Sequence, residues 1–288
     1  MRILVTGANG YLGTGVVRQL CNDGQDVIAA CHSSSDLVDK RAEIRQGDIF
    51  ELKDPFNDLG KPDVLLHMAW RNGFVHNDSS HIMDLPRHYE FIKKMIDGGV
   101  KHVAVMGSMH EVGFFEGSIK EDTPTHPESL YGIAKDALRN MTKLLCKNAR
   151  VTFQWLRGYY IVGNSNFGCS IFSKITLAEK EGKERFPFTT GINQWDFIDY
   201  DEFARQVAAT VEQDEINGVI NICHGRPEKL ADRVERFIRD NHYKIKLDYG
   251  KFPDRPYDSK AVWGDDTKIR KILSRRQLLQ GDIECENK

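Results

Sequence analysis

The chain has 288 residues, with 40 Lys and Arg against 42 Asp and Glu, which gives a formal net charge of −2. This balance, without a basic run, argues against nucleic acid or an anionic membrane as a partner. The six cysteines lack metal-ligand spacing and no apolar run approaches the roughly 18 residues of a membrane span, so we expect a reduced, metal-free, cytoplasmic protein.

The first half of the chain alternates short apolar runs with longer amphipathic ones. The short runs predict strands at Arg2–Thr6, Asp26–Cys31, Asp63–Ala69, His102–Met106 and Val151–Arg157. The longer runs predict helices at Tyr11–Asn22, Ser79–Gly98 and Leu130–Asn148, with Pro86 kinking the second helix or delaying its start. Strands that alternate with crossover helices form a parallel sheet, so the predicted fold class is α/β, a Rossmann-type doubly wound parallel sheet. The first strand begins so close to Met1 that we expect no signal peptide.

The pattern changes from about Gly163. Helices are predicted at Phe172–Gly182, Asp201–Asp214 and Lys229–Asn241, and a strand at Val219–Cys223. We therefore divide the chain into a Rossmann domain (residues 1–162), a smaller C-terminal α/β lobe (163–273) and a polar, frayed tail (274–288). Some segments of the second part are expected to return to the first domain's sheet.

A glycine-rich loop, Gly7-x-x-Gly10-x-x-Gly13, connects the first strand to the first helix. In this context Gly7 permits a tight turn, Gly10 lets the backbone approach a pyrophosphate, and Gly13 lets the helix pack on the strand. The alternative is a turn that binds nothing. We predict a dinucleotide site that also includes the intervening residues Asn9, Tyr11 and Leu12.

The end of the second strand bears on the choice of dinucleotide. An acidic residue that would hold the ribose 2′-hydroxyl of NAD is absent there, and His32, Ser33 and Ser34 stand in its place. Serine hydroxyls with Lys40 or Arg41 nearby favour the 2′-phosphate of NADPH, whereas a shifted loop that returns Asp36 would favour NAD.

Two further segments are expected to contact the cofactor. Asp48, followed by Ile49, is placed to accept a hydrogen bond from the adenine amino group, or else to cap a turn. Residues at the end of the strand 63–69 and just after it are expected on the nicotinamide side: Met68, Ala69 and Trp70.

Tyr131 and Lys135 are four residues apart in a predicted helix, so their side chains project from the same face. A lysine charge favours the phenolate and would let the phenol exchange a proton near neutral pH. Ser108, which follows another strand, supplies a hydroxyl. Separately, these residues could be helix packing, a surface lysine and a strand cap. Together they predict redox chemistry between a carbonyl and an alcohol.

Several motifs in this order resemble the extended short-chain dehydrogenase/reductase family, of the NAD-dependent epimerase/dehydratase type. They are Gly7–Gly13, His67–Ala69, Gly107–Ser108, Tyr131–Lys135, Leu156–Gly163, Asp196–Asp199 and Trp263–Lys268. The resemblance implies a nicotinamide domain, a C-terminal substrate lobe, a nucleotide-diphospho-sugar substrate, and a homodimer formed through the helices 79–98 and 130–148. It also implies that Tyr131 is the general acid/base, that Lys135 holds the nicotinamide ribose, and that Ser108 orients the substrate oxygen.

Departures from the family pattern narrow the reaction. Sugar-nucleotide dehydratases carry an Asp-Glu pair after the catalytic hydroxyl, where this chain has Met109 and His110, so dehydration is disfavoured. Glu111 could substitute only in a different register. The residues expected to contact the sugar or its diphosphate are Trp70, Arg71, Ser108, Met109, His110, Tyr159 and Arg255.

The sequence therefore predicts an NADPH-dependent reductase of a nucleotide-diphospho-4-keto-6-deoxyhexose, resembling enzymes of deoxysugar biosynthesis. One alternative is a nucleotide-sugar 4-epimerase that retains NAD and returns the hydride to the other face of the ketone. Another is a non-catalytic regulator that senses NADP(H). Such a regulator has no need to keep Ser108, Tyr131 and Lys135 together.

Overall fold

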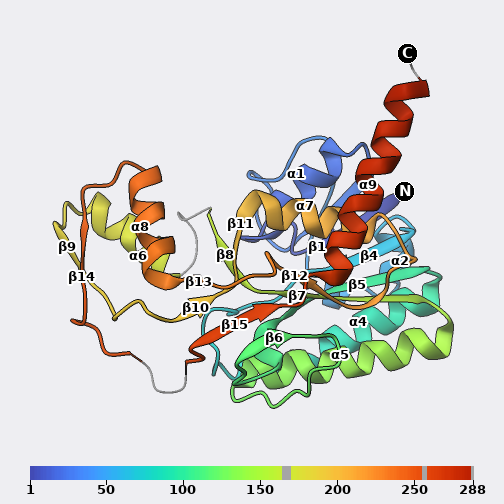
Figure 1. Ribbon diagram of the computed structural model, residues 1–288. Coiled ribbons are helices and arrows are strands. Elements are labelled where there is room, and N and C mark those ends of the chain that lie inside the picture. The colour runs from blue at the N-terminus through green and yellow to red at the C-terminus, as the bar shows by residue number, and fades with distance from the viewer. Residues whose placement is uncertain (164–169, 255–257, 287–288) are drawn as a thin grey trace.

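A seven-stranded sheet lies at the centre of the protein, whose computed structural model describes residues 1–163, 170–254 and 258–286 (Figure 1). All its neighbouring strands pair in parallel, in the order β12-β7-β5-β4-β1-β2-β3. The strands are β1 (Arg2–Thr6), β2 (Asp26–Cys31), β3 (Glu43–Gln46), β4 (Val64–His67), β5 (His102–Ser108), β7 (Thr152–Gly158) and β12 (Gly218–Ile222). The strand order reverses between β1 and β4, which is where doubly wound sheets bind ligands.

Helices cover both faces of this sheet, as Figure 1 shows. One layer contains α1 (Gly13–Asn22), α7 (Tyr200–Val211) and α9 (Thr267–Glu286). The other contains α2 (Pro55–Asp58), α4 (Leu85–Gly98) and α5 (Leu130–Ala149). Because both faces are covered, strands such as β4 and β5 are buried along their whole length. The predicted Rossmann-type fold is confirmed.

The helix predicted at 79–98 is interrupted. It consists of α3 (Ser80–Met83) and α4, which are separated at Asp84, and Pro86 lies in the first turn of α4. Proline lacks the amide hydrogen that a helix interior requires, but the first turn leaves that hydrogen unpaired. Strand β3 was not predicted, because most of its residues are exposed and no apolar run marks it.

A smaller lobe lies beside the sheet (Figure 1). It contains α6 (Ile171–Lys180), β9 (Arg185–Pro187), α8 (Leu230–Asp240) and β14 (Lys246–Asp248), around a core that includes Phe172, Phe188 and Phe237. Two further sheets adjoin the lobe: β13 (Glu228–Lys229), β10 (Gln194–Trp195), β15 (Ala261–Gly264) and β6 (Gly117–Ile119) in one, β8 (Tyr160–Val162) and β11 (Phe197–Asp199) in the other. From the second half of the chain, α7, β12 and α9 return to the layers of the large sheet.

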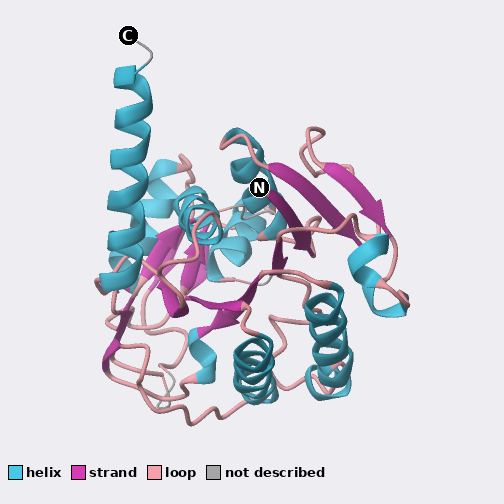
Figure 2. Ribbon diagram, turned by 90° about the vertical axis from the view of Figure 1, so that its right-hand side faces the viewer, coloured by secondary structure: helices cyan, strands magenta, loops and turns pink. Residues whose placement is uncertain are grey.

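The end of the chain differs from the frayed tail that we expected. Helix α9 continues through residue 274 to Glu286 and extends beyond the rest of the protein (Figure 2). Its start is anchored because Ile269 and Ile272 are buried and Arg276 forms ion pairs with Asp23 and Glu212. None of the helices within the described ranges has the length and apolar character that crossing a membrane requires.

Candidate active site

The glycine loop makes the tight turn that its spacing predicts. Gly7 has a φ of +66°, and a Cβ at this position would lie 2.8 Å from the Cα of Ala69. A Cβ at Gly13 would lie 2.2 Å from the carbonyl oxygen of Gly7, so only glycine allows α1 to start so close to β1. The amide of Gly10 donates to that same carbonyl over 3.0 Å, which closes the turn.

The start of α1 fits an anionic ligand. Leu12 precedes the helix and supplies no side-chain cap, and Gly10 is exposed, so a phosphate could approach the backbone there. Tyr11 reaches across to the carbonyl of Gly163, to which its hydroxyl donates over 2.9 Å. The residues at the loop therefore fit the pyrophosphate of a dinucleotide.

The loop after β2 is tied to the glycine loop through Asn9. The Asn9 side-chain amide donates to Ser33 Oγ (3.1 Å) and to the Ser34 carbonyl (2.9 Å). The Ser34 hydroxyl donates to Asp36 over 2.6 Å, which places a carboxylate in this loop. His32 is exposed beside these residues.

The positive charge expected near this loop is partly neutralised. The guanidinium of Arg41 donates to both carboxylate oxygens of Asp39, over 2.9 and 2.6 Å, and to Asn22 over 2.7 Å. Hydrogen bonds from Arg41 hold the pKa of Asp39 at about 2. Lys40 is exposed.

Asp48 caps a turn, which was the alternative to contact with adenine. Its carboxylate accepts from the amide of Phe50 over 3.0 Å, at the start of η1 (Ile49–Glu51), and also pairs with Arg87 over 3.0 Å. Ile49 is buried in the core between the sheet and α4.

Ser108, Tyr131 and Lys135 come together at the carboxyl end of β5. Ser108 is the last residue of β5 and accepts from the His110 amide over 3.3 Å at the start of η2 (Met109–Glu111). Its hydroxyl is near the phenol of Tyr131 and acts to lower the pKa of that phenol. Both Tyr131 and Lys135 are in the first turns of α5, and Lys135 Nζ donates to the Met106 carbonyl over 2.7 Å.

The proton affinities differ from those expected from the spacing. Burial raises the pKa of Tyr131 to about 12, while the hydrogen bond with Ser108 acts in the opposite direction and the charge of Glu111 adds to the rise. Burial also lowers the pKa of Lys135 to about 7. In the protein alone the phenol is therefore protonated at neutral pH, because burial favours its neutral form.

Four aromatic rings surround Tyr131. His76 stacks on it at 5.4 Å, His81 lies at 5.2 Å, and the rings of Trp70 and His110 approach edge-on at 6.0 Å. His76 and His81 were missed in the sequence because they lie in or beside a loop with no regular pattern. The carbonyl of His76 also accepts from the Tyr131 amide over 2.8 Å, so this loop holds the start of α5.

The segment at the end of β4 joins the two halves of the site. The amides of Met68 and Ala69 donate to Thr6 Oγ1 at the end of β1, over 3.1 and 3.2 Å. Ala69 adjoins Gly7, and Trp70 adjoins Tyr131. The glycine loop and the Tyr131 hydroxyl are therefore connected through three consecutive residues.

Other residues predicted to touch the substrate have different surroundings. Arg71 is exposed and pairs with Asp84 before α4. Met109 and Tyr159 are buried in a small apolar cluster, and the phenol of Tyr159 has no hydrogen-bond partner among the described residues. His110 lies against His76, with ring centroids 4.3 Å apart. Arg255 lies outside the described residues.

Glu111 cannot replace the missing dehydratase acid. It is fully buried, and its carboxylate accepts from Arg157 Nε over 2.6 Å and from Trp155 Nε1 over 2.7 Å. The ion pair with Arg157 directs the carboxylate into the core beneath η2. The expectation that dehydration is disfavoured therefore gains a structural reason.

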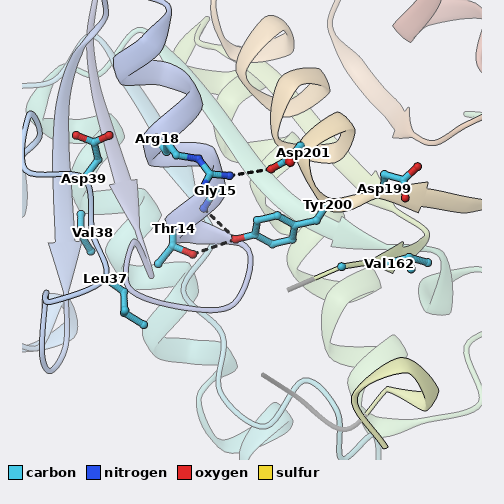
Figure 3. A pocket seen from close by; sticks show the side chains of 11 residues that line it. Thr14, Gly15, Arg18, Leu37, Val38, Asp39, Val162, Asp199, Tyr200 and Asp201 are labelled. Carbon is cyan, nitrogen blue, oxygen red and sulfur yellow. Dashed lines mark hydrogen bonds and ion pairs between the residues drawn. The ribbon is translucent and has the colours of Figure 1, made fainter. Parts of the chain in front are cut away.

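A pocket of about 720 Å³ lies beside α1, between the loop after β2 and the start of α7 (Figure 3). Tyr200 lies in it, with its hydroxyl 3.0 Å from the Gly15 amide and 2.6 Å from the Tyr11 carbonyl. The described lining residues do not include Tyr131 or Ser108, so this pocket is separate from their hydroxyls. Tyr200 instead fixes the start of α1.

The chain is similar in sequence and in fold to several known proteins. The chain is 42% identical over 269 residues to dTDP-6-deoxy-L-talose 4-dehydrogenase (NAD(+)) of Aggregatibacter actinomycetemcomitans, across 92% of this chain and 99% of the relative. Its fold matches MoeE5 in complex with UDP-glucuronic acid and NAD, with a TM-score of 0.79, 22% identity and coverage of 95% and 93%. It also matches UDP-glucose 4-epimerase of Thermotoga maritima with UDP-glucose, with a TM-score of 0.79, 22% identity and coverage of 94% and 92%.

A model of the NAD dependent epimerase/dehydratase family matches residues 3–223, which include the glycine loop, Ser108 and Tyr131. The chain therefore belongs to this family, and it is an oxidoreductase of the extended short-chain dehydrogenase/reductase type.

Proposed function

We propose that the protein interconverts the C4 hydroxyl and the C4 ketone of a nucleotide-linked 6-deoxyhexose, with NAD as the co-substrate. The observation that carries this proposal is that Ser108 is close enough to Tyr131 to lower the pKa of its phenol, with Lys135 one helical turn further along α5. The relative that is 42% identical over 99% of its own length is named as a 4-dehydrogenase of such a sugar.

The roles of the three residues follow from their positions. Ser108 donates a hydrogen bond to the substrate oxygen at C4, and Tyr131 transfers the proton. In oxidation the C4 hydroxyl gives its proton to Tyr131 as the ketone forms, and in reduction Tyr131 returns it. Bound NAD supplies the hydride acceptor, or the donor when it is reduced. Lys135 provides a positive charge near the phenol, which stabilises the phenolate that oxidation requires.

The same site serves both directions, because a reaction and its reverse share one transition state. The reductase expected from the sequence and the dehydrogenase activity in the relative's name are therefore two directions of one type of reaction. The raised pKa of Tyr131 leaves the phenol protonated at neutral pH, which is the form that reduction uses. We expect oxidation to become faster, and reduction slower, as the pH rises.

We propose NAD in preference to NADP, in contrast to the preference from the sequence. The carboxylate of Asp36, bound to the Ser34 hydroxyl, would repel a 2′-phosphate in this loop. Arg41, one of the two cations expected to hold that phosphate, is paired with Asp39. The NAD(+) in the relative's name supports the same choice.

The residues that we propose for the cofactor are the glycine loop from Gly7 to Gly13, with Asn9, and the segment 68–70. Ser33 and Ser34 are tied to this loop through Asn9, which supports a role for them in holding the adenosine ribose. Asp48 and Ile49 are less suited to direct contact, because one is engaged with Arg87 and the other is buried. Of the predicted sugar contacts, Ser108, His110 and Trp70 are grouped around Tyr131.

A 4-epimerase remains the second candidate, since a neighbour by fold carries that name. The test is to incubate the purified protein with dTDP-6-deoxy-L-talose and either NAD+ or NADP+, and to measure the absorbance of the reduced cofactor and the sugar products. Our proposal predicts one reduced nicotinamide for each ketone formed, with NAD+ preferred. An isomerised sugar without net reduction of added NAD+ would identify an epimerase instead.

We also propose a homodimer formed through α4 and α5. On α5, Ile133 and Leu144 are 44% and 59% exposed and are 11 residues apart, which is about three helical turns. They therefore share one face, and a second copy of the chain would cover these apolar side chains.

A further inference from the structure

Lys135 is a buried cation without a carboxylate partner in the described part of the chain. Its side chain is 3% exposed. Both oxygens of Glu111, an acid that influences it, are bound by Trp155 and Arg157. Its ammonium donates a hydrogen bond to the neutral carbonyl of Met106. Burial therefore favours the neutral amine, and the ammonium form gains from any other group that stabilises it.

The indole of Trp70 is in the right place to do so. Lys135 Nζ lies 3.8 Å from the centroid of the Trp70 ring, which is well within the distance for a cation–π interaction. The same nitrogen is 5.9 Å from the ring of Tyr131, so the indole is the nearer face. The ammonium is thus held between an aromatic face and a backbone carbonyl.

Two histidines fix the orientation of the indole. Trp70 Nε1 donates to His81 Nδ1 over 3.0 Å, and His81 Nε2 lies 3.0 Å from the Val75 carbonyl. An indole nitrogen only donates and a carbonyl only accepts, so His81 is neutral with its proton on Nε2. His88 stacks on the indole, with ring centroids 4.5 Å apart and planes inclined by 16°.

His88 is itself held by a chain of hydrogen bonds that begins at Thr6, the last residue of β1. Thr6 Oγ1 accepts from the amides of Met68 and Ala69, so its proton points to His67 Nδ1, 2.8 Å away. His67 Nε2 then donates to His88 Nδ1 over 2.8 Å. This order of donors requires both histidines to be neutral. Burial accordingly lowers the pKa of both, that of His67 to about 3, and the Lys135 charge acts in the same direction.

We propose that Trp70 is a positioning residue for Lys135, holding the lysine charged and close to Tyr131 through its indole face, with His81 and His88 fixing the ring. The effect of Trp70 on turnover rests on the proposed function, whereas its effect on the charge of Lys135 does not. The titratable groups that face or influence Lys135 are His67 at the end of β4, His88 on α4, Tyr131 on α5 and Glu111 in η2.

Trace acetylation measures the titration of Lys135 directly, without cofactor or sugar. Only a neutral amine reacts, so the pH midpoint of Lys135 labelling, followed by mass spectrometry of its peptide, reports how firmly the charge is held. Trp70→Leu should move this midpoint down by about one pH unit, because the aromatic face is lost. Trp70→Phe keeps a weaker face and should shift it less, in the same direction. Val75→Ala, which removes an exposed side chain from the same loop and keeps the carbonyl that faces His81, should leave it unchanged.

Turnover provides the second measurement. The rise of sugar oxidation with pH should begin at a higher pH in Trp70→Leu than in the unmodified protein, because a weaker lysine charge stabilises the Tyr131 phenolate less, and Trp70→Phe should restore part of the difference. A wild-type labelling midpoint in both variants would overturn the proposal, even if turnover fell. If Trp70→Leu does not fold, a Trp70→Phe variant with the wild-type midpoint of Lys135 labelling would be enough to overturn the proposal. A shifted midpoint in a protein that oxidises or reduces no sugar would instead refute the proposed function and leave the Trp70 role intact.

Discussion

The chemistry of Tyr131 depends on its surroundings more than on its spacing from Lys135. The spacing alone suggested a phenol that titrates near neutral pH, and burial instead raises the pKa of Tyr131 to about 12. The residue types and their order were sufficient to predict which hydroxyls meet. Desolvation could not be predicted, because the rings beside the phenol include His76, from a loop that no pattern marks, and His81, from the short helix α3.

Replacing Tyr131 with phenylalanine removes the proton that the mechanism transfers. We expect Tyr131→Phe to bind NADH with near-normal affinity and to lower turnover by about a hundredfold or more. Tyr249→Phe is the matched control, since the Tyr249 hydroxyl donates to Glu235 on the lobe surface. Steady-state kinetics and fluorescence titration with NADH compare the two variants. Equal turnover in both would remove Tyr131 from the mechanism.

Asp36 is the residue on which the cofactor choice depends. Asp36→Ala removes the carboxylate beside Ser34, so we expect kcat/KM for NADP+ relative to NAD+ to rise by about tenfold or more. The measurement is initial rates with each cofactor at saturating sugar. An unchanged ratio would mean that the 2′-phosphate, or its absence, is recognised elsewhere.

At the scale of elements, the turn η2 is supported from below by a buried ion pair. Glu111 in η2 and Arg157 on β7 are both fully buried, and their charges neutralise each other. Ser108 precedes this turn directly, so the pair also restricts where the serine hydroxyl can lie. No sequence pattern indicated this pair, because its members are 46 residues apart.

Breaking this pair should be costly. Glu111→Gln leaves a buried guanidinium without its counter-charge, and we expect the free energy of unfolding in urea to fall by about 3 kcal/mol or more. The exposed pair of Lys93 and Asp97 on α4 provides the contrast. Lys93→Ala should change the free energy of unfolding far less, because water screens an exposed pair. Similar effects of the two substitutions would show that the buried pair contributes no more than a surface one.

The connection between β4 and α4 should make the fold sensitive to acid. His67, with a pKa lowered to about 3, and His88, with a pKa also well below its usual value, stay neutral in the folded state. In the unfolded chain both bind protons below about pH 6.5, so stability is full above that pH and is lost as the pH falls towards 3. Between pH 7 and pH 5 we expect each to cost roughly 2 kcal/mol.

This acid effect is measured by urea unfolding at the two pH values. His88→Gln should lose part of the pH dependence that the unmodified protein shows, because one of the two histidines no longer titrates. Identical pH dependence in the two proteins would contradict the neutral pair. Other buried histidines contribute equally to both, so the difference isolates His88.

At the scale of the whole molecule, the large sheet was predicted better than the shorter elements around it. Parallel strands such as β4 and β5 are buried on both faces and appear as continuous apolar runs, which is why the Rossmann-type fold could be predicted. Strand β3 is mostly exposed and the strands adjoining the lobe, such as β10, are short, so neither leaves such a run. Pro86 indicated that the helix predicted at 79–98 would be irregular. It did not indicate that the break would lie at Asp84.

The proposed homodimer through α4 and α5 is also a property of the whole molecule that can be tested. We expect a dimer in light scattering at micromolar concentration, and we expect Leu144→Glu to give a monomer, because a charge on the shared face of α5 would be buried between two copies. Leu177→Glu on α6 is the control, since Leu177 is similarly exposed, at 57%, but lies in the lobe. A monomeric unmodified protein, or a dimer that Leu144→Glu leaves intact, would contradict this interface.

The central claim is that a hydride passes from C4 of the sugar to a nicotinamide that then leaves the enzyme. The most direct test is to supply dTDP-6-deoxy-L-talose deuterated at C4, with NAD+, and to locate the deuterium by mass spectrometry. The account predicts deuterated NADH in solution, in equal amount to the ketone formed, and almost none with Tyr131→Phe. Deuterium that stays on the sugar, with the configuration at C4 inverted or unchanged, would contradict it.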